Sequence, residues 1–271
     1  MDIWIPNKEI VHPSIIAPSI RDIEKLERAR WNNKRKSFRE FPITKYELAW
    51  SQVGSATSAN GTTSATVTKP TGTSNDDRVI LSVLSIPRTN TPTCTGFNNV
   101  VSFVYVTDDV RFTVFERLSS SDGSNYTVNV TSATLTIVTA ETWRGGVTSG
   151  TLVDAVGAGN SGASNPIQAN AISPANSTDL LLFRAGYVGP SGGSTSPPSG
   201  MTETLDADVG GTGIIMYNAY QILTASGSTG NKSTSPTGTT GWLAVLVALN
   251  LATAAGSGKP YLYYAQQRAL N

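Results

Sequence analysis

The chain contains two segments in which a polar turn leads into an almost continuously apolar stretch. The first extends from Lys69 to Pro87, where Pro70 and an Asn-Asp-Asp cluster precede the apolar residues 79–86. Proline presets its own φ angle, and Asn and Asp side chains bond their own backbone, so the polar part predicts a turn. An apolar run of this length, rich in β-branched residues, predicts a strand that is covered on both faces.

The same order of features returns in residues 172–187, where Pro174 and a polar turn ending at Asp179 precede a second apolar run. Further alternating or apolar segments, separated by Ser/Gly turns, follow in each half: 111–118, 126–130 and 135–143 in the first, and 214–223 and 242–249 in the second. The distance along the chain between the two repeated segments is longer than the repeat of a solenoid or propeller. The pattern therefore predicts an all-β protein, an antiparallel β-sandwich of jelly-roll or immunoglobulin-like type. We expect it to be internally duplicated, with each half contributing strands to both sheets.

These patterns divide the chain into three parts. An N-terminal arm is predicted over residues 1–50, the sandwich over 51–251 and a C-terminal tail over 252–271. Within the sandwich, the halves span 57–147 and 165–251, and a Gly-rich crossing over 145–162 connects them.

Composition supports a β protein with long polar turns, since 39% of the 271 residues are hydrophobic and only 14% are charged. The net charge of +1 provides no global field that would favour nucleic acid or an anionic membrane. The single cysteine, Cys94, excludes an intramolecular disulfide and is interpreted as a half-buried loop thiol. The first residues lack the features of a signal peptide, and the longest apolar run is far shorter than the ~20 residues of a membrane helix. We therefore expect a soluble protein made in a cytoplasm.

The N-terminal arm differs from the rest of the chain, because half of the 20 lysines and arginines lie in residues 1–50. Three prolines in residues 3–18 predict extended chain, since proline removes a donor and disfavours the helical conformation at the residue before it. Ser19 with Asp22 has the spacing of a helix N-terminus, which predicts one helix over residues 19–36.

The arm combines large apolar side chains with a basic cluster, and it has no turn that would fold it on itself. Exposing such apolar side chains forgoes roughly 1.5–3 kcal/mol each, so we expect them to lie against a partner. The basic part has three open explanations: a solvated helix end that the macrodipole favours, an acidic protein surface, or nucleic acid. The predicted partner-binding residues are Trp4, Ile10, Val11, Ile15, Ile16, Arg28, Arg30, Trp31, Lys34, Arg35 and Lys36.

The sequence offers little catalytic chemistry. The only histidine, His12, lies in the arm, so a Ser-His-Asp arrangement or a His/Cys zinc site has no histidine inside the sandwich. Glycosidases use two carboxylates across a cleft, and a carboxylate pair can also bind calcium. We interpret the three pairs in this chain as turn residues: Asp76/Asp77, Asp108/Asp109 and Asp206/Asp208. The sequence thus predicts no enzyme, no cofactor and no metal.

Three aromatic residues have two open interpretations. Trp143, Tyr187 and Tyr220 could form a platform for stacking a sugar, or they could pack in the core or at its rim. Because Trp143 and Tyr187 end apolar strands, the packing interpretation is favoured.

Several motifs resemble a β-sandwich module that occurs in many tailed-bacteriophage structural proteins. They are the turn and strand at 68–84, Ala-Glu-Thr-Trp-Arg-Gly at 140–145, 152–159, 198–203 and 242–249. The resemblance covers residues 57–251 and consists of turn and strand signals. Cys94-Thr-Gly-Phe97 departs from it, since a Pro-x-Gly-Trp element is expected there.

The resemblance implies a non-enzymatic virion structural protein. We expect a capsid decoration or cement protein, anchored by its arm to capsid or other virion proteins and forming a homo-oligomer. The alternative is a phage tail, baseplate or fibre component that binds host glycans. Neither a membrane nor nucleic acid is an expected partner.

Overall fold

The computed structural model describes residues 49–189 and 196–252. Almost all of their regular structure is β-strand, arranged in antiparallel sheets, which confirms the predicted all-β class. The predicted helix over 19–36, the rest of the arm up to residue 48 and the tail from residue 253 lie outside the described residues.

The first half forms one large sheet and one small sheet. The large sheet has the order β1-β9-β4-β7-β6, with β2 also paired to β9. Its strands are β1 (Ser51–Gln52), β2 (Thr57–Gly61), β4 (Arg78–Ile86), β6 (Asn98–Tyr105), β7 (Val110–Leu118) and β9 (Leu135–Arg144). The small sheet has the order β3-β8-β5, formed by β3 (Ser64–Thr68), β8 (Asn125–Asn129) and β5 (Thr93–Cys94).

The second half repeats this plan. Its large sheet has the order β10-β17-β13-β15-β14, with β11 also paired to β17, and its small sheet pairs β12 with β16. The elements are β10 (Val153–Val156), β11 (Asn160–Gly162), β12 (Ile167–Ala169), β13 (Leu180–Val188), β14 (Thr202–Asp208), the short 3-10 helix η1 (Val209–Gly211), β15 (Ile214–Ile222), β16 (Lys232–Thr234) and β17 (Gly241–Leu249).

The repeat extends to details of strand pairing. In the first half, the register between β6 and β7 shifts between Asn99 and Val101. In the second half, the register between β14 and β15 shifts between Glu203 and Leu205, at the corresponding place. A β-bulge is a specific local feature, so its recurrence at the same position shows that the two halves share one topology.

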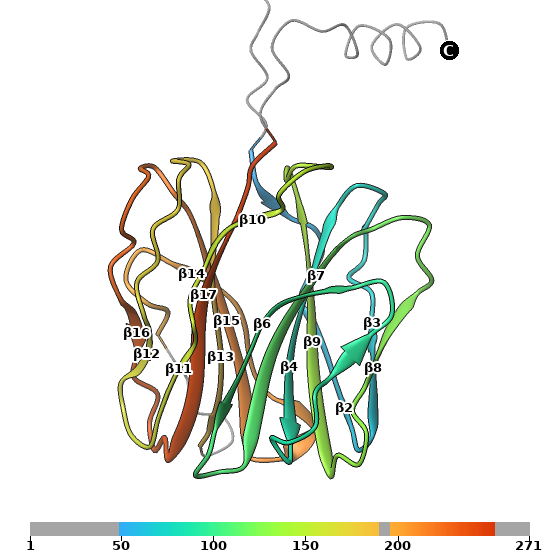
Figure 1. Cartoon of the computed structure of the whole chain (residues 1–271), viewed down its shortest axis with the longest axis vertical. Coiled ribbons are helices and arrows are strands. Elements are labelled where there is room, and N and C mark those ends of the chain that lie inside the picture. The colour runs from blue at the N-terminus through green and yellow to red at the C-terminus, as the bar shows by residue number, and fades with distance from the viewer. Residues whose placement is uncertain (1–48, 190–195, 253–271) are drawn as a thin grey trace, which may run out of the picture. The chain divides into compact units, whose positions relative to one another are not determined.

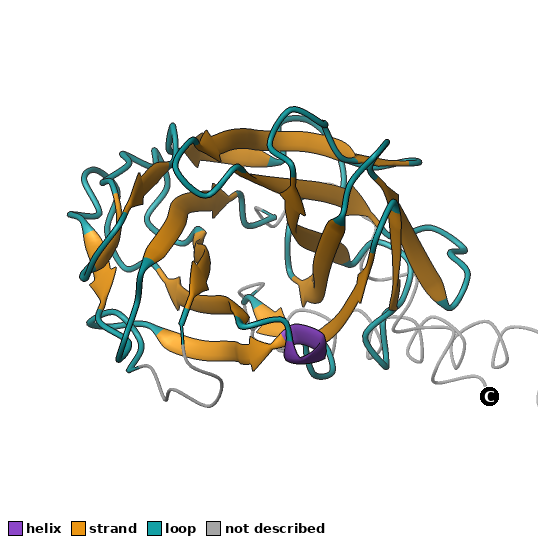
Figure 2. Ribbon diagram, turned by 90° about the horizontal axis from the view of Figure 1, so that it is seen from below, coloured by secondary structure: helices purple, strands orange, loops and turns teal. Residues whose placement is uncertain are grey.

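The four sheets form layers (Figures 1 and 2). The two large sheets face each other across a central core, to which Leu84 and Phe112 come from the first half and Leu182 and Val245 from the second. Each small sheet covers the outer face of its own large sheet through a separate apolar core. The prediction that each half contributes strands to both sheets is therefore wrong, because each half builds a large sheet of its own.

One contact between the halves has an approximate counterpart. Strand β6 of the first half contacts β10, β11 and β17 of the second, while η1, which follows β14, contacts β2. Because β6 corresponds to β14 and β2 to β11, the contact of η1 with β2 is the approximate counterpart of the contact of β6 with β11. An approximate two-fold axis, as in an isologous dimer, generates such a pair of contacts.

The structure confirms the most apolar of the predicted strands, but it corrects the prediction for the crossing between the halves. Strand β4 is buried along nearly its whole length, as its unbroken apolar sequence predicted. The Gly-rich crossing 145–162 contains two strands, β10 and β11, which pair with β17 and extend the second half toward the N-terminus.

Candidate functional site

The described chain begins and ends at the same end of the sandwich. The backbone N–H of Ala252 donates to the carbonyl of Gly145 at 2.9 Å. A Cβ placed on Gly145 would lie 2.7 Å from the carbonyl oxygen of Ala49, so these two backbones are also in close contact. Figure 1 shows the two ends together at the top of the molecule. Whatever residues 1–48 and 253–271 bind, they are connected to the sandwich at this one end, which we call the attachment end.

Trp50 fixes the point at which the chain enters. Its side chain is buried, and its ring lies against Gly146, where a Cβ would come within 2.6 Å of the ring and 3.0 Å of Arg78 Cγ. The glycine is needed here because the indole and the arginine stem occupy the space of a side chain. Residue 50 therefore belongs to the core.

The predicted partner-binding residues all lie outside the described residues. They are Trp4, Ile10, Val11, Ile15, Ile16, Arg28, Arg30, Trp31, Lys34, Arg35 and Lys36.

Two of the three carboxylate pairs have structural roles in turns, as predicted. Asp77 accepts two hydrogen bonds of 2.8 Å from Arg144 and one of 2.8 Å from the backbone N–H of Ser74. Asp109 has a φ of 54° and accepts a 3.0 Å hydrogen bond from Arg88.

The third carboxylate pair is placed differently from the prediction. Asp206 and Asp208 lie on the edge strand β14, not in a turn. Within residues 49–189 and 196–252, no three His, Cys, Asp or Glu side chains gather closely enough to hold a metal ion.

The three aromatic residues do not form a common surface. Trp143 is buried in the central core, where its ring packs on Tyr220 with a centroid distance of 4.7 Å. Tyr187 is buried in the outer core of the second half, on the opposite face of its sheet. This confirms that the aromatic side chains pack in the core.

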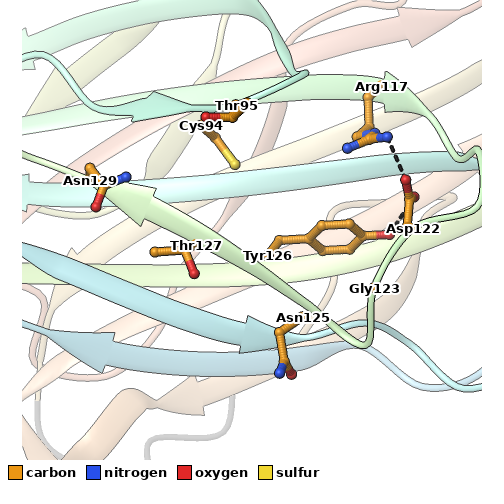
Figure 3. A pocket seen from close by; sticks show the side chains of 9 residues that line it. All are labelled: Cys94, Thr95, Arg117, Asp122, Gly123, Asn125, Tyr126, Thr127 and Asn129. Atoms are coloured by element: carbon orange, nitrogen blue, oxygen red, sulfur yellow. Dashed lines mark hydrogen bonds and ion pairs between the residues drawn. The ribbon is translucent and has the colours of Figure 1, made fainter.

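A pocket of about 260 Å³ lies beside the small sheet of the first half (Figure 3). Asp122 pairs with Arg117 and accepts hydrogen bonds from Ser119 at 2.8 Å and from Tyr126 at 3.1 Å. The Arg117 guanidinium also lies 5.2 Å from the centre of the Phe97 ring. Burial, reinforced by the neighbouring Asp122 carboxylate, raises the pKa of Tyr126. These contacts hold the loop before β8. They also pair the two charged side chains of the pocket, Asp122 and Arg117, with each other.

Cys94 lines the same pocket from β5 and is half-buried, which agrees with the predicted exposure but places it in a short strand. Burial raises the pKa of its thiol to about 11, while the nearby Arg117 acts in the opposite direction. The thiol is therefore protonated at neutral pH, and thiolates are the reactive form of cysteine.

Comparison with known proteins gave no match to a protein-family model, a curated protein or a solved structure. In the part of the chain that the structure describes, no helix has the length and apolar character needed to span a membrane.

Proposed function

We propose that this protein is a non-enzymatic structural protein of a tailed-bacteriophage virion, a capsid decoration subunit that residues 1–50 anchor to the particle. The observation that carries the proposal is the meeting of Ala49 and Ala252 at Gly145. Both undescribed terminal segments start at one end, so a surface that holds them leaves the opposite end of the sandwich free. That is the geometry of a tethered, projecting domain.

The chemistry of the arm supports a protein partner. Its large apolar side chains would bind in a groove, and its basic cluster would meet carboxylates, which favour encounter and register. Ordering an extended chain on binding carries a conformational cost, so the contact should bury on the order of 1,000 Å² or more. The proposal includes contacts with neighbouring capsid proteins, the formation of a homo-oligomer and location in the virion.

The sandwich supports a structural role. Arg184 and Glu141 are both buried and bind each other between the halves, and the exposed Arg144 binds the buried Asp77 at a turn. The assignment of the fold to the jelly-roll or immunoglobulin-like type of β-sandwich is also part of the proposal, as is the relation to phage virion modules.

The experiment compares the full chain with a variant lacking residues 1–40 in binding to particles that lack the protein. We expect the truncated variant to retain its β-type circular dichroism and cooperative melting, since every described strand lies after residue 50. It should no longer occupy the particles. If the truncated protein binds as well as the full chain, the anchor lies in the sandwich and the proposal is wrong.

A further inference from the structure

Exposed residues with uncharged polar side chains line the pocket of about 260 Å³ beside the small sheet of the first half (Figure 3). Strand β8 exposes Asn125, Thr127 and Asn129 to it, because alternate residues of a strand point to the same face. Thr95, in the turn after β5, is exposed as well and lines the pocket from another segment. The pocket therefore offers two carboxamides and two hydroxyls that solvent, or a ligand, can reach.

The pocket carries no net charge that would select an ion. Of the described residues that line it, Arg117 and Asp122 are the only charged ones, and they pair with each other. The Asp122 side chain is 3% exposed and also accepts hydrogen bonds from Ser119 and Tyr126. An ion would find no unpaired charge of opposite sign here, whereas a neutral polar molecule would meet the amides and hydroxyls.

These side chains match the chemistry of a sugar. A carboxamide has donors and an acceptor, and a hydroxyl can both donate and accept, as sugar hydroxyls also do. Alternate residues of a strand are roughly 6–7 Å apart, a distance that one sugar ring with its hydroxyls can bridge. Ligand pockets for larger molecules commonly measure roughly 300–1,000 Å³, so this smaller pocket suits a single sugar residue. The half-buried Cys94 side chain adds an apolar contact for the carbon skeleton.

The second half shows that the fold does not require an open pocket at this place. Strand registers place Gln221 at the position of Arg117. Gly200 lies against Gln221, just as Gly96 lies against the arginine. Lys232 of the small sheet crosses this region, donating to Gln221 at 2.9 Å and to the backbone carbonyl before Gly200 at 3.2 Å. The open polar lining in the first half therefore calls for an explanation beyond the fold.

We propose that the pocket binds one uncharged sugar residue. The Asn125 and Asn129 amides donate to its hydroxyls and accept from them, and the Thr95 hydroxyl binds it from the opposite segment. The paired charges of Arg117 and Asp122 hold the loop that shapes the pocket. This inference does not rest on the proposed position in a virion.

The test is saturation-transfer NMR on the full-length protein, with the methyl glycosides of glucose, galactose and N-acetylglucosamine as probes. Asn129→Trp fills the pocket from an exposed position on β8. Asn60→Trp, at an exposed position on β2, is the matched control. We expect transfer to at least one glycoside, a loss of affinity of about tenfold or more in Asn129→Trp, and no change in the control.

The double variant Asn125→Ala/Asn129→Ala removes both amides without adding volume. Both residues are exposed, so the variant should keep the Tm of the unaltered protein. Losing neutral hydrogen bonds from two side chains should weaken binding about fivefold or more. The proposal is overturned if none of the three glycosides shows transfer, or if either pocket variant leaves the transfer unchanged. Transfer to N-acetylglycine N-methylamide but to no glycoside would also overturn it, because the pocket would then recognise peptide amides.

Discussion

Arg184 of the second half binds Glu141 of the first half through two hydrogen bonds, of 3.0 and 2.6 Å, at the centre of the protein. Their side chains are 0% and 1% exposed. Thr204 and Trp143 donate to the same carboxylate, at 2.6 and 3.2 Å. By strand register, the reciprocal positions hold Ser82 and Val247. The ion pair thus occurs once, and it fixes the alignment of the two large sheets.

Removing the Arg184 charge should destabilise the protein strongly. Arg184→Met leaves the Glu141 carboxylate buried without its cation, and breaking such a pair costs about 3–5 kcal/mol. The double variant Glu141→Leu/Arg184→Met should recover most of that loss, because it removes both charges. Urea denaturation measures each free energy of unfolding. If the double variant is as unstable as Arg184→Met alone, the loss reflects packing and not an unpaired charge.

Close packing between the halves should make Gly159 intolerant of a side chain. A Cβ there would lie 2.4–2.6 Å from three ring atoms of Phe103, and the residue has a φ of +84°. Gly150 is the control, since it has a φ of +80° but no atom within 4 Å of the added carbon. Both alanine variants pay a backbone penalty of about 1–2 kcal/mol. Gly159→Ala should lose about 1–3 kcal/mol more from overpacking, visible as a lower Tm, and equal Tm values for the two variants would refute the steric argument.

Asp179 should make stability depend on pH. Burial, reinforced by a hydrogen bond and repulsion from Asp154, raises the pKa of this carboxyl to about 7. The unfolded value is about 3.9, so the folded protein holds an extra proton between these values. The contribution of Asp179 to stability is therefore fully present below the unfolded pKa and is lost as pH rises through about 7. Denaturation at several pH values checks this, and Asp179→Asn should flatten the slope; an unchanged slope would assign it to another group.

The basic cluster of the arm should govern the rate of attachment. Changing Lys34, Arg35 and Lys36 to Glu reverses its charge, so association with particles lacking the protein should slow, most strongly at low salt where screening is weak. Changing the same residues to Gln provides the control for lost charge without reversal. Equal association rates of all three proteins at low salt would remove the cluster from the anchoring mechanism.

Local sequence predicted the repeated strands well, because β4 and its counterpart β13 are apolar runs with turn residues before them. It could not predict the layering, since a strand buried on both faces does not reveal which face meets which sheet. Strands β10 and β11 escaped notice because they are short, lie in a Gly-rich segment and are held by pairing with the distant β17.

The buried charges inside the sandwich were also missed, although a signal was available. Arg78, Glu116, Glu141 and Arg184 are charged residues within or at the ends of otherwise apolar strands, and such charges are buried only when paired. Their pairing joins strands far apart in sequence, so local patterns could not assign the partners. The anchoring residues of the arm lie outside the described residues and remain predictions.

The orientation of the protein on its particle tests the central claim most directly. Cryo-electron microscopy of intact virions, combined with gold labelling of a cysteine introduced at Val106, would place both ends of the sandwich. Val106 is 62% exposed and lies in the turn between β6 and β7, at the end opposite Gly145. We predict density for the four layers on the capsid surface, with Gly145 facing the shell and the label facing outward. A label against the shell, or protein absent from the virion, would contradict the account.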